Sequence, residues 1–80
     1  MIIRSQGKTK IVNFDNVKAI EIELGSRTYY NDFYKVMAIM SDNIFVLLGS
    51  YDTEDIAKEV LEEIIKCVAV NLDIFDMPEE

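Results

Sequence analysis

The chain has 80 residues, with 15 Asp and Glu against 8 Lys and Arg, so its formal net charge at pH 7 is −7. Half of the residues are hydrophobic and 29% are charged, which is typical of one folded domain over residues 1–80 and excludes a disordered acidic segment. The sequence contains no histidine, which excludes Ser-His-Asp and Cys-His catalysis and histidine-metal sites.

The first predicted elements are three strands. Residues 1–14 predict a β-hairpin with its turn at Gln6 and Gly7, where Gly7 would supply the positive φ that a tight turn usually requires. Asn and Asp in NFDN at 13–16 favour a turn that ends this hairpin. Residues 17–24, VKAIEIEL, alternate between aliphatic and other side chains, which predicts a strand with one wet face.

Two further strands are expected at 33–40 (FYKVMAIM) and 44–51 (IFVLLGSY), after a turn-rich segment at 25–32 and around a turn at 41–43. Both strands are apolar on both faces, so we expect them to pair at the centre of the sheet. One helix covers only one face. Sheet curvature or a second protein molecule would have to cover the other face. Depending on the register of the two strands, that face carries Tyr34, Val36, Ala38 and Met40 on one strand and Phe45 and Leu47 on its neighbour.

Residues 52–70 predict an amphipathic helix. Asp52 or Thr53 can cap its first turn. Its apolar stripe consists of Ile56, Val60, Ile64 and Val68 with Ala57 and Leu61 beside it. Favourable ion pairs are expected between Glu54 and Lys58 and between Glu62 and Lys66. Cys67, the single cysteine, is expected to be a small buried hydrophobic side chain near this stripe.

The negative charge is concentrated in the last 29 residues. Residues 1–51 have a net charge of +1, and residues 52–80 have a net charge of −8. Glu59 and Glu63 repeat like charges at a spacing of four residues, an arrangement that does not stabilise a helix. This acidic face is either a solvated surface that keeps the protein soluble or a binding surface for a basic protein, and it opposes direct binding to nucleic acid.

Residues 71–80 form an apolar-acidic tail, in which Pro78 ends any regular helix. The tail carries more apolar side chains than one helix stripe can bury. It therefore either folds back over the sheet edge as part of the core or docks against another chain, including a second copy. The residues expected in self-association are Leu72, Ile74, Phe75 and Met77.

Catalytic and metal-binding motifs are absent from the sequence. There is no CxxC, GxGxxG or phosphate-binding GxxxxGK pattern, and DTED at 52–55 lacks the spacing of a calcium loop. Stacking of nucleic-acid bases on Tyr29, Tyr30, Phe33 and Tyr34, with help from Arg27 and Lys35 or from Arg4, Lys8 and Lys10, is a weaker alternative that the acidic half opposes. We expect a non-enzymatic protein without a metal ion or cofactor.

No apolar run approaches the roughly 20 residues of a membrane-spanning helix, because the longest, residues 44–49, has six. Met1 leads directly into a predicted strand without a signal-peptide pattern. A single cysteine agrees with a reducing compartment. We therefore expect a cytoplasmic protein that does not bind membranes.

Three stretches, MIIRSQ, VNFDNV and LLGSYDTEDIAKEVLEEI, together resemble short uncharacterised proteins of phages and mobile elements of Gram-positive bacteria. The resemblance covers about two thirds of the chain and excludes residues 25–43 and the tail. It implies a small sheet followed by one helix. It also implies a setting in which small acidic proteins often inhibit host defence, anti-CRISPR proteins being the best-known example, by imitating the charge of nucleic acid.

The sequence thus predicts an α+β fold, with a five-stranded, mainly antiparallel sheet (1–51), one C-terminal amphipathic helix (52–70) and the tail (71–80). The expected function is that of an interaction module that binds a basic surface of another protein, with a nucleic-acid-handling defence protein as one such target. The residues expected at that contact are Glu59, Glu62, Glu63, Asp73 and Asp76. The alternative is a homodimer formed through the second sheet face and the tail.

Overall fold

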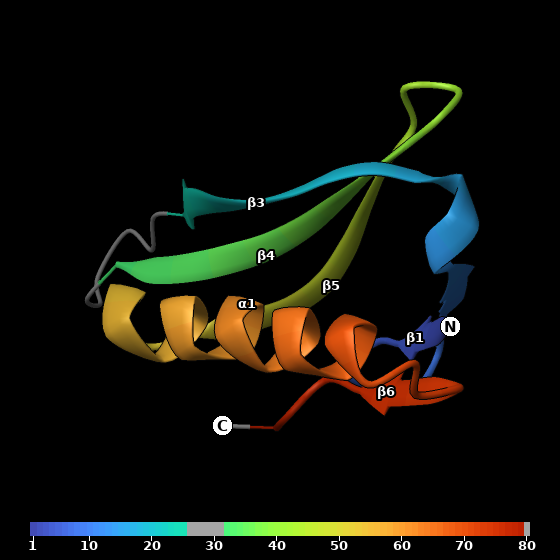
Figure 1. The fold of residues 1–80 in the computed structure, drawn as a ribbon. Helices are drawn as coiled ribbons and strands as arrows, with labels where there is room; N and C mark the ends of the chain where they lie inside the picture. The colour runs from blue at the N-terminus through green and yellow to red at the C-terminus, as the bar shows by residue number, and fades with distance from the viewer. Residues whose placement is uncertain (26–31, 80) are drawn as a thin grey trace.

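A computed structural model of the chain describes residues 1–25 and 32–79. The fold is α+β, with a C-terminal helix as expected, but the strands form two three-stranded sheets (Figure 1). The prediction of a single five-stranded sheet is therefore wrong. The elements in chain order are β1 (Ile2–Arg4), β2 (Ile11–Asn13), a 3-10 turn (Phe14–Asn16), β3 (Val17–Gly25), β4 (Phe33–Met40), β5 (Phe45–Tyr51), α1 (Glu54–Ala69) and β6 (Ile74–Asp76).

Sheet A has the order β2-β1-β6 and contains the sixth strand that the sequence analysis did not predict. β1 pairs antiparallel with β2 and parallel with β6, so that Ile3 lies between Val12 and Phe75. These three side chains are buried, while both neighbours of Phe75 are exposed. The tail therefore folds back into the core of its own chain, which is the first of the two alternatives considered for it.

The end of α1 explains how the tail turns back. Val70 caps the helix, and Asn71 follows with a left-handed φ of 57°. The Leu72 N–H then donates to the Cys67 carbonyl and the Asn71 N–H donates to the Val68 carbonyl, at 3.0 and 3.2 Å. This pair of bonds is a Schellman motif, with Asn in the position that glycine usually occupies. It stops the helix and directs the chain toward β1.

The hairpin between β1 and β2 is confirmed, but its turn differs from the prediction. Lys8 has the positive φ, 61°, and Gly7 does not. The Lys8 N–H donates to the Ser5 carbonyl at 2.8 Å, and the buried Ser5 Oγ accepts from the Lys10 N–H at 3.1 Å. These local hydrogen bonds hold Lys8 in a conformation that side chains other than glycine adopt less readily.

Sheet B has the order β3-β4-β5 and is antiparallel throughout. Val36 and Ala38 are completely buried on the face toward α1. Phe45 and Leu47 lie on the opposite, outer face, because they pair with Ile39 and Met37. The predicted grouping of Val36 and Ala38 with Phe45 and Leu47 is therefore wrong, since these pairs occupy opposite faces. A register shift between Val36 and Met37 places Leu48, which is 1% exposed, in the core.

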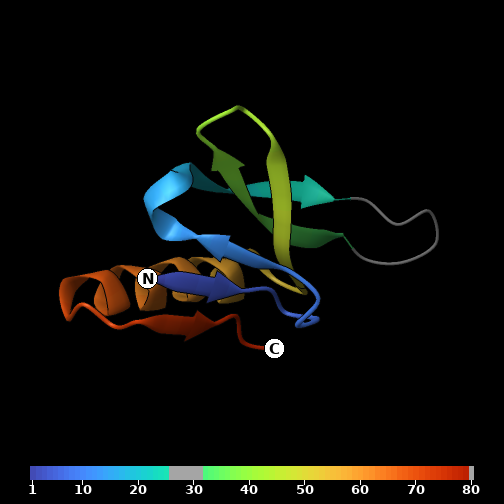
Figure 2. The same cartoon turned by 90° about the vertical axis from the view of Figure 1, so that its right-hand side faces the viewer.

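The two sheets and α1 enclose one hydrophobic core. Figures 1 and 2 show α1 running along one side of sheet B, with sheet A against another side of the helix. Of the two candidate caps, Thr53 is the N-cap, because its side chain accepts from the Ile56 N–H at 3.1 Å. The buried helix residues are Ala57, Val60, Ile64 and Cys67, so the expected burial of Cys67 is confirmed.

Gln6 connects the sheets at the hairpin tip. Its backbone N–H donates to the Leu48 carbonyl at 2.7 Å. Its side chain accepts from the Ser50 N–H at 2.9 Å and donates to the Ser50 and Glu79 carbonyls at 3.0 and 2.9 Å. The Gln6 amide therefore pairs with the backbone of Ser50 as a neighbouring strand would, and it fixes the tail at the same point.

Candidate interaction surfaces

The acidic ridge, defined as Glu59, Glu62 and Glu63, lies on the exposed side of α1. Lys58 pairs with Glu54 at 3.1 Å, as expected. Lys66 contacts Glu63 at 3.7 Å and not the expected Glu62. Within the described residues, Glu59 and Glu62 have no ion-pair partner. Two uncompensated carboxylates are thus available on this side of the helix.

Asp76 lies apart from the ridge and already has a partner. On β6 it forms a two-pronged ion pair with Arg4 of β1, in which Arg4 Nη2 and Asp76 Oδ2 are 3.0 Å apart. This hydrogen bond holds the pKa of Asp76 below its ordinary value. Asp73 is exposed, and its carbonyl accepts from the Ile2 N–H at 2.8 Å. The five predicted contact residues therefore lie on two separate elements and the loop between them.

The four residues predicted for self-association divide into two pairs. Phe75 and Met77 are 8% and 3% exposed and belong to the core, so their side chains are not free to contact a second copy. Leu72 and Ile74 are about half exposed, at 47% and 55%. The structure thus leaves only part of the expected tail surface accessible.

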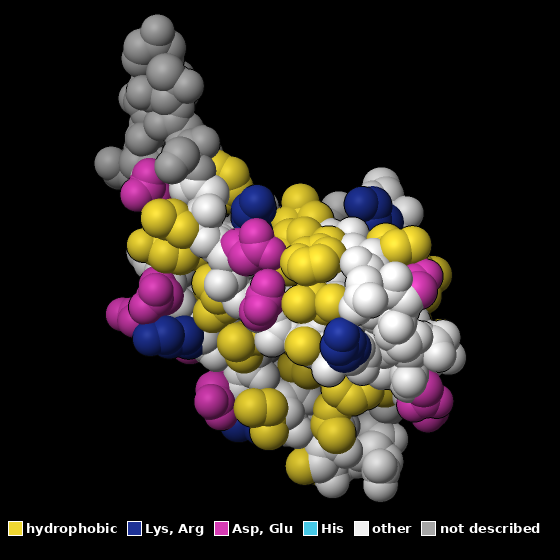
Figure 3. Space-filling model, turned by 90° about the horizontal axis from the view of Figure 1, so that it is seen from above, with side chains coloured by type: hydrophobic (Ala, Val, Ile, Leu, Met, Phe, Trp, Pro, Cys, Tyr) yellow, Lys and Arg dark blue, Asp and Glu magenta, His cyan; other side chains and the backbone are white. Residues whose placement is uncertain are grey.

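The outer face of sheet B carries an exposed hydrophobic patch. Phe45 and Leu47 are 53% and 39% exposed, and the partly buried Ile39 and Met37 lie beside them on β4. Figure 3 shows hydrophobic side chains gathered across the face of the molecule seen from above, with acidic and basic groups among them. This patch is the second apolar face of the sheet that the sequence predicted. Phe45 and Leu47 were expected on it, but their neighbours on β4 are Ile39 and Met37 and not Val36 and Ala38.

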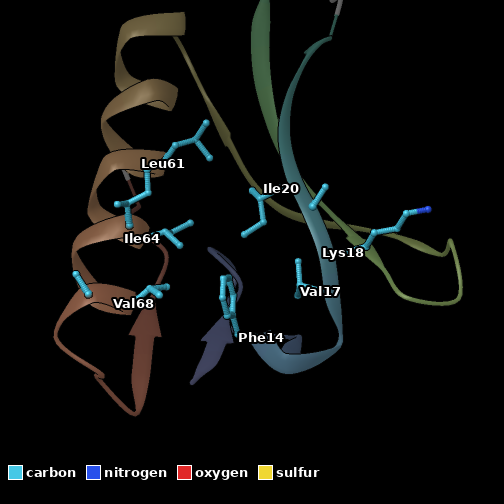
Figure 4. A pocket seen from close by; sticks show the side chains of 10 residues that line it. Phe14, Val17, Lys18, Ile20, Leu61, Ile64 and Val68 are labelled. Atoms are coloured by element: carbon cyan, nitrogen blue, oxygen red, sulfur yellow. The ribbon is translucent and has the colours of Figure 1, made fainter.

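An open apolar groove of about 500 Å³ lies between α1 and β3. Figure 4 shows Ile20 of β3 and Leu61 of α1 directed toward the groove from opposite sides, Phe14 at one end, and Lys18 directed away from the helix. Ile65 and Val68 on the helix side are 59% and 42% exposed. We call this feature the α1–β3 groove; its lining residues are Phe14, Val17, Lys18, Ala19, Ile20, Leu61, Ile64, Ile65, Val68 and Ala69.

Sequence reasoning missed this groove, although the helix contains a signal for it. Ile65 and Ala69 follow Leu61 at intervals of four residues, which widens the apolar stripe beyond what the core buries. Val68, assigned to the buried stripe, is instead exposed on the groove side. A stripe too wide for its own core indicates a surface that another chain can cover.

The residues considered for nucleic-acid stacking are only partly described. Arg27, Tyr29 and Tyr30 lie outside the described residues. Phe33 is opposite Gly25 across the β3–β4 pair, whereas Tyr34, the next residue along β4, packs against the core. Of the basic residues, Arg4 is engaged with Asp76, and Lys8 and Lys10 are exposed at the hairpin.

The described part of the chain contains no group of three or more Cys, Asp and Glu placed to hold a metal ion. Nor does any helix within it have the length and apolar character needed to cross a membrane. No protein-family model, curated protein or solved structure matches the chain.

Proposed function

We propose that this protein is a non-enzymatic interaction module that binds a basic surface of another protein through its acidic ridge. The observation that carries the proposal is the exposure of Glu59 and Glu62 without an ion-pair partner among the described residues, in the segment 52–80, which has a net charge of −8. Charge of one sign on one surface attracts a partner of opposite charge and accelerates their association.

Asp73 extends the proposed contact beyond the helix, because it is exposed where the chain leaves α1. Asp76 contributes less, since Arg4 already compensates its charge. The proposed target is a nucleic-acid-handling protein, including a CRISPR-type defence protein, because a row of carboxylates on a rigid helix can imitate the phosphates that its basic channel binds. The proposal includes a cytoplasmic location, which the single cysteine favours.

The test compares paired baits in a lysate of a Gram-positive host. One bait is the wild-type protein, and the other carries Glu59→Gln, Glu62→Gln and Glu63→Gln, which remove three charges but keep the side-chain shape. We expect basic nucleic-acid-binding proteins on the wild-type bait, release by rising salt, and their loss from the variant. A control variant with Asp32→Asn and Asp52→Asn, both exposed and outside the ridge, should retain them. Equal recovery by the wild-type and ridge-variant baits would show that the ridge is ordinary solvated surface.

A homodimer is the second candidate, and the exposure of Phe45 and Leu47 on the outer face of sheet B favours it. In this arrangement the outer faces of two copies of sheet B pack together. The expected result is a mass that increases with concentration in analytical ultracentrifugation and returns to that of a monomer in Phe45→Ser. A wild-type protein that stays monomeric at high micromolar concentration would contradict the dimer.

A further inference from the structure

We propose that β3 and the α1–β3 groove form a second docking site, which binds an extended segment of another protein as an added β-strand. The segment would alternate apolar side chains, directed into the groove, with Lys or Arg side chains. This site is distinct from the acidic ridge, and either site can bind without the other.

The backbone of β3 provides the first part of the argument. β3 is the nine-residue edge strand of sheet B, and within residues 1–25 and 32–79 it pairs only with β4. The N–H and C=O groups on its other edge are therefore a template for a further strand. Strand addition of this kind supplies main-chain hydrogen bonds that depend little on the sequence of the partner.

The groove provides side-chain specificity beside this edge. It follows Val17–Ile20 along β3 and Leu61–Ala69 along α1. Three steps along the strand span about 10 Å and eight steps along the helix span about 12 Å, so the two walls are similar in length. An added strand of about eight residues alongside β3 would place two apolar side chains in the groove, where they would cover Ile65 and Val68, and would continue past Glu21 and Glu23. Burial of this apolar surface would favour binding in addition to the backbone pairing.

Charge identifies the chemical class of the occupant. The β3 residues Glu21 and Glu23 have no ion-pair partner within the described residues, although Lys35 of β4 lies opposite Glu23 in the register. Lys58 and Lys66 of α1 are already paired. Lys18 donates to Asn43 Oδ1 at 3.0 Å. A second copy pairing through β3 would bring two Glu21–Glu23 sets together and add its own net charge of −7. The site therefore favours a basic, partly apolar segment of a different protein.

The test uses the full-length protein and a capped eight-residue peptide of alternating valine and lysine as the probe. Amide NMR shifts should map to β3 and the groove, and the β3 amides should exchange more slowly with deuterated water when the peptide is bound. A peptide with glutamate in place of lysine, and one with N-methylated valines, should bind about tenfold more weakly or worse. Equal binding of the N-methylated peptide, or no binding of the probe, would overturn the proposal.

Variants separate the two sites. Ile65→Asp changes an exposed groove residue and should weaken the peptide about tenfold without unfolding the protein, and Glu21→Lys with Glu23→Lys should do the same. The ridge variant with Glu59→Gln, Glu62→Gln and Glu63→Gln should keep most of the peptide binding, because none of these three residues lines the groove. Shifts confined to the ridge, or a dimer that protects β3 in the absence of peptide, would exclude this docking site. If the ridge variant loses its basic partners while the peptide still binds, both the acidic-ridge proposal and the β3 docking proposal are supported. If both baits recover the same proteins and the peptide still binds, only the acidic-ridge proposal is contradicted.

Discussion

At the scale of single residues, the tail is held by polar groups of buried or half-buried side chains. Tyr51 ends β5 and is 1% exposed, and its hydroxyl donates to the Pro78 carbonyl at 2.7 Å. Its ring lies over Gly49, where a Cβ would be 2.8 Å from the hydroxyl oxygen. Gly49 is thus required for close approach and not for an unusual φ, because none of the described glycines has a positive φ.

Burial raises the pKa of Tyr51 to about 12. Since its ordinary value is about 10, the folded state holds the proton more firmly than the unfolded state, and the resulting stability is complete below pH 10 and lost as the pH rises toward 12. Tyr51→Phe should lower the free energy of unfolding at pH 7 by about 1 kcal/mol, because it removes the bond to Pro78. Between pH 10 and 12 the variant should lose less stability than the wild type. Urea unfolding at several pH values measures the difference, and parallel curves for the two proteins would contradict this role.

The Arg4–Asp76 ion pair makes a second prediction at this scale. In Arg4→Gln, the pKa of Asp76 should rise toward its ordinary value of 3.8, because its largest cause of depression, the hydrogen bond from Arg4, is removed. In the wild type, the small stability from Asp76 is present above that ordinary value and is lost as the pH falls through the lowered pKa. Carboxyl NMR titration measures the shift. Lys8→Gln is the matched control and should change this pKa less, because Lys8 is its weakest contributor; an equal response to both changes would argue against the pair.

At the scale of elements, one face of α1 is buried in the core and its other faces are exposed to solvent. Val60 is 3% exposed in the core, whereas Val70, at the C-cap of the same helix, is 66% exposed. Ile65 and Val68 are 59% and 42% exposed and line the α1–β3 groove. The apolar surface of this helix thus serves both folding and the proposed docking.

Val60→Asp should unfold the domain. It places a carboxylate without a partner in the core, which costs several kcal/mol. That cost is comparable with the whole stability of roughly 4–12 kcal/mol expected for a chain of this size. Val70→Asp makes the same chemical change at an exposed position and should stay within about 0.5 kcal/mol of the wild type. Far-ultraviolet circular dichroism during thermal unfolding compares the two. A folded Val60→Asp variant, or equal loss in both, would show that the helix packs differently.

At the scale of the whole molecule, the N-terminal hairpin, β5 and the tail meet at Gln6. Its amide binds Ser50 and Glu79, which lie 44 and 73 residues away along the chain. Figure 2 shows the C-terminal segment alongside β1, on the far side of β1 from β2. The two sheets therefore share a core and a polar connection, although no backbone ladder joins them into one sheet among the described residues.

Gln6→Ala should lower the free energy of unfolding by about 1–3 kcal/mol, because it leaves the half-buried Ser50 backbone groups without partners. Gln6→Glu should lower the free energy of unfolding at least as much at pH 7, because a carboxylate would face the Ser50 and Glu79 carbonyl oxygens. Below pH 5 the carboxyl group is protonated and can donate a hydrogen bond, so this variant should recover stability there. Chemical unfolding at pH 7 and pH 4 tests this. Thr9→Ala, an exposed change in the same hairpin, should have little effect, and a Gln6→Glu variant with no pH response beyond the wild type's would contradict the role of the amide.

The sequence by itself determined the elements with strong local patterns. The alternation in residues 17–24, the long apolar strands at 33–40 and 44–51 and the helical stripe from Ile56 to Ile64 all correspond to observed elements. Thr53 as one of two caps, the Glu54–Lys58 pair and the burial of Cys67 also followed from spacing alone. Such features depend on neighbours within four residues, which the sequence displays directly.

Only the tertiary structure decided how these elements combine. A strand of three residues such as β6 carries too little pattern to be recognised, and its formation depends on β1, which lies about 70 residues away in the chain. The register shift in β5 placed Leu48 in the core and Leu47 outside, which no local signal indicated. For the same reason Phe75 and Met77 became core residues, Asp76 became the partner of Arg4, and Ile65 became part of a groove. The local sequence pattern allows either face of a strand to be buried, and the pairing with distant strands determines which face enters the core.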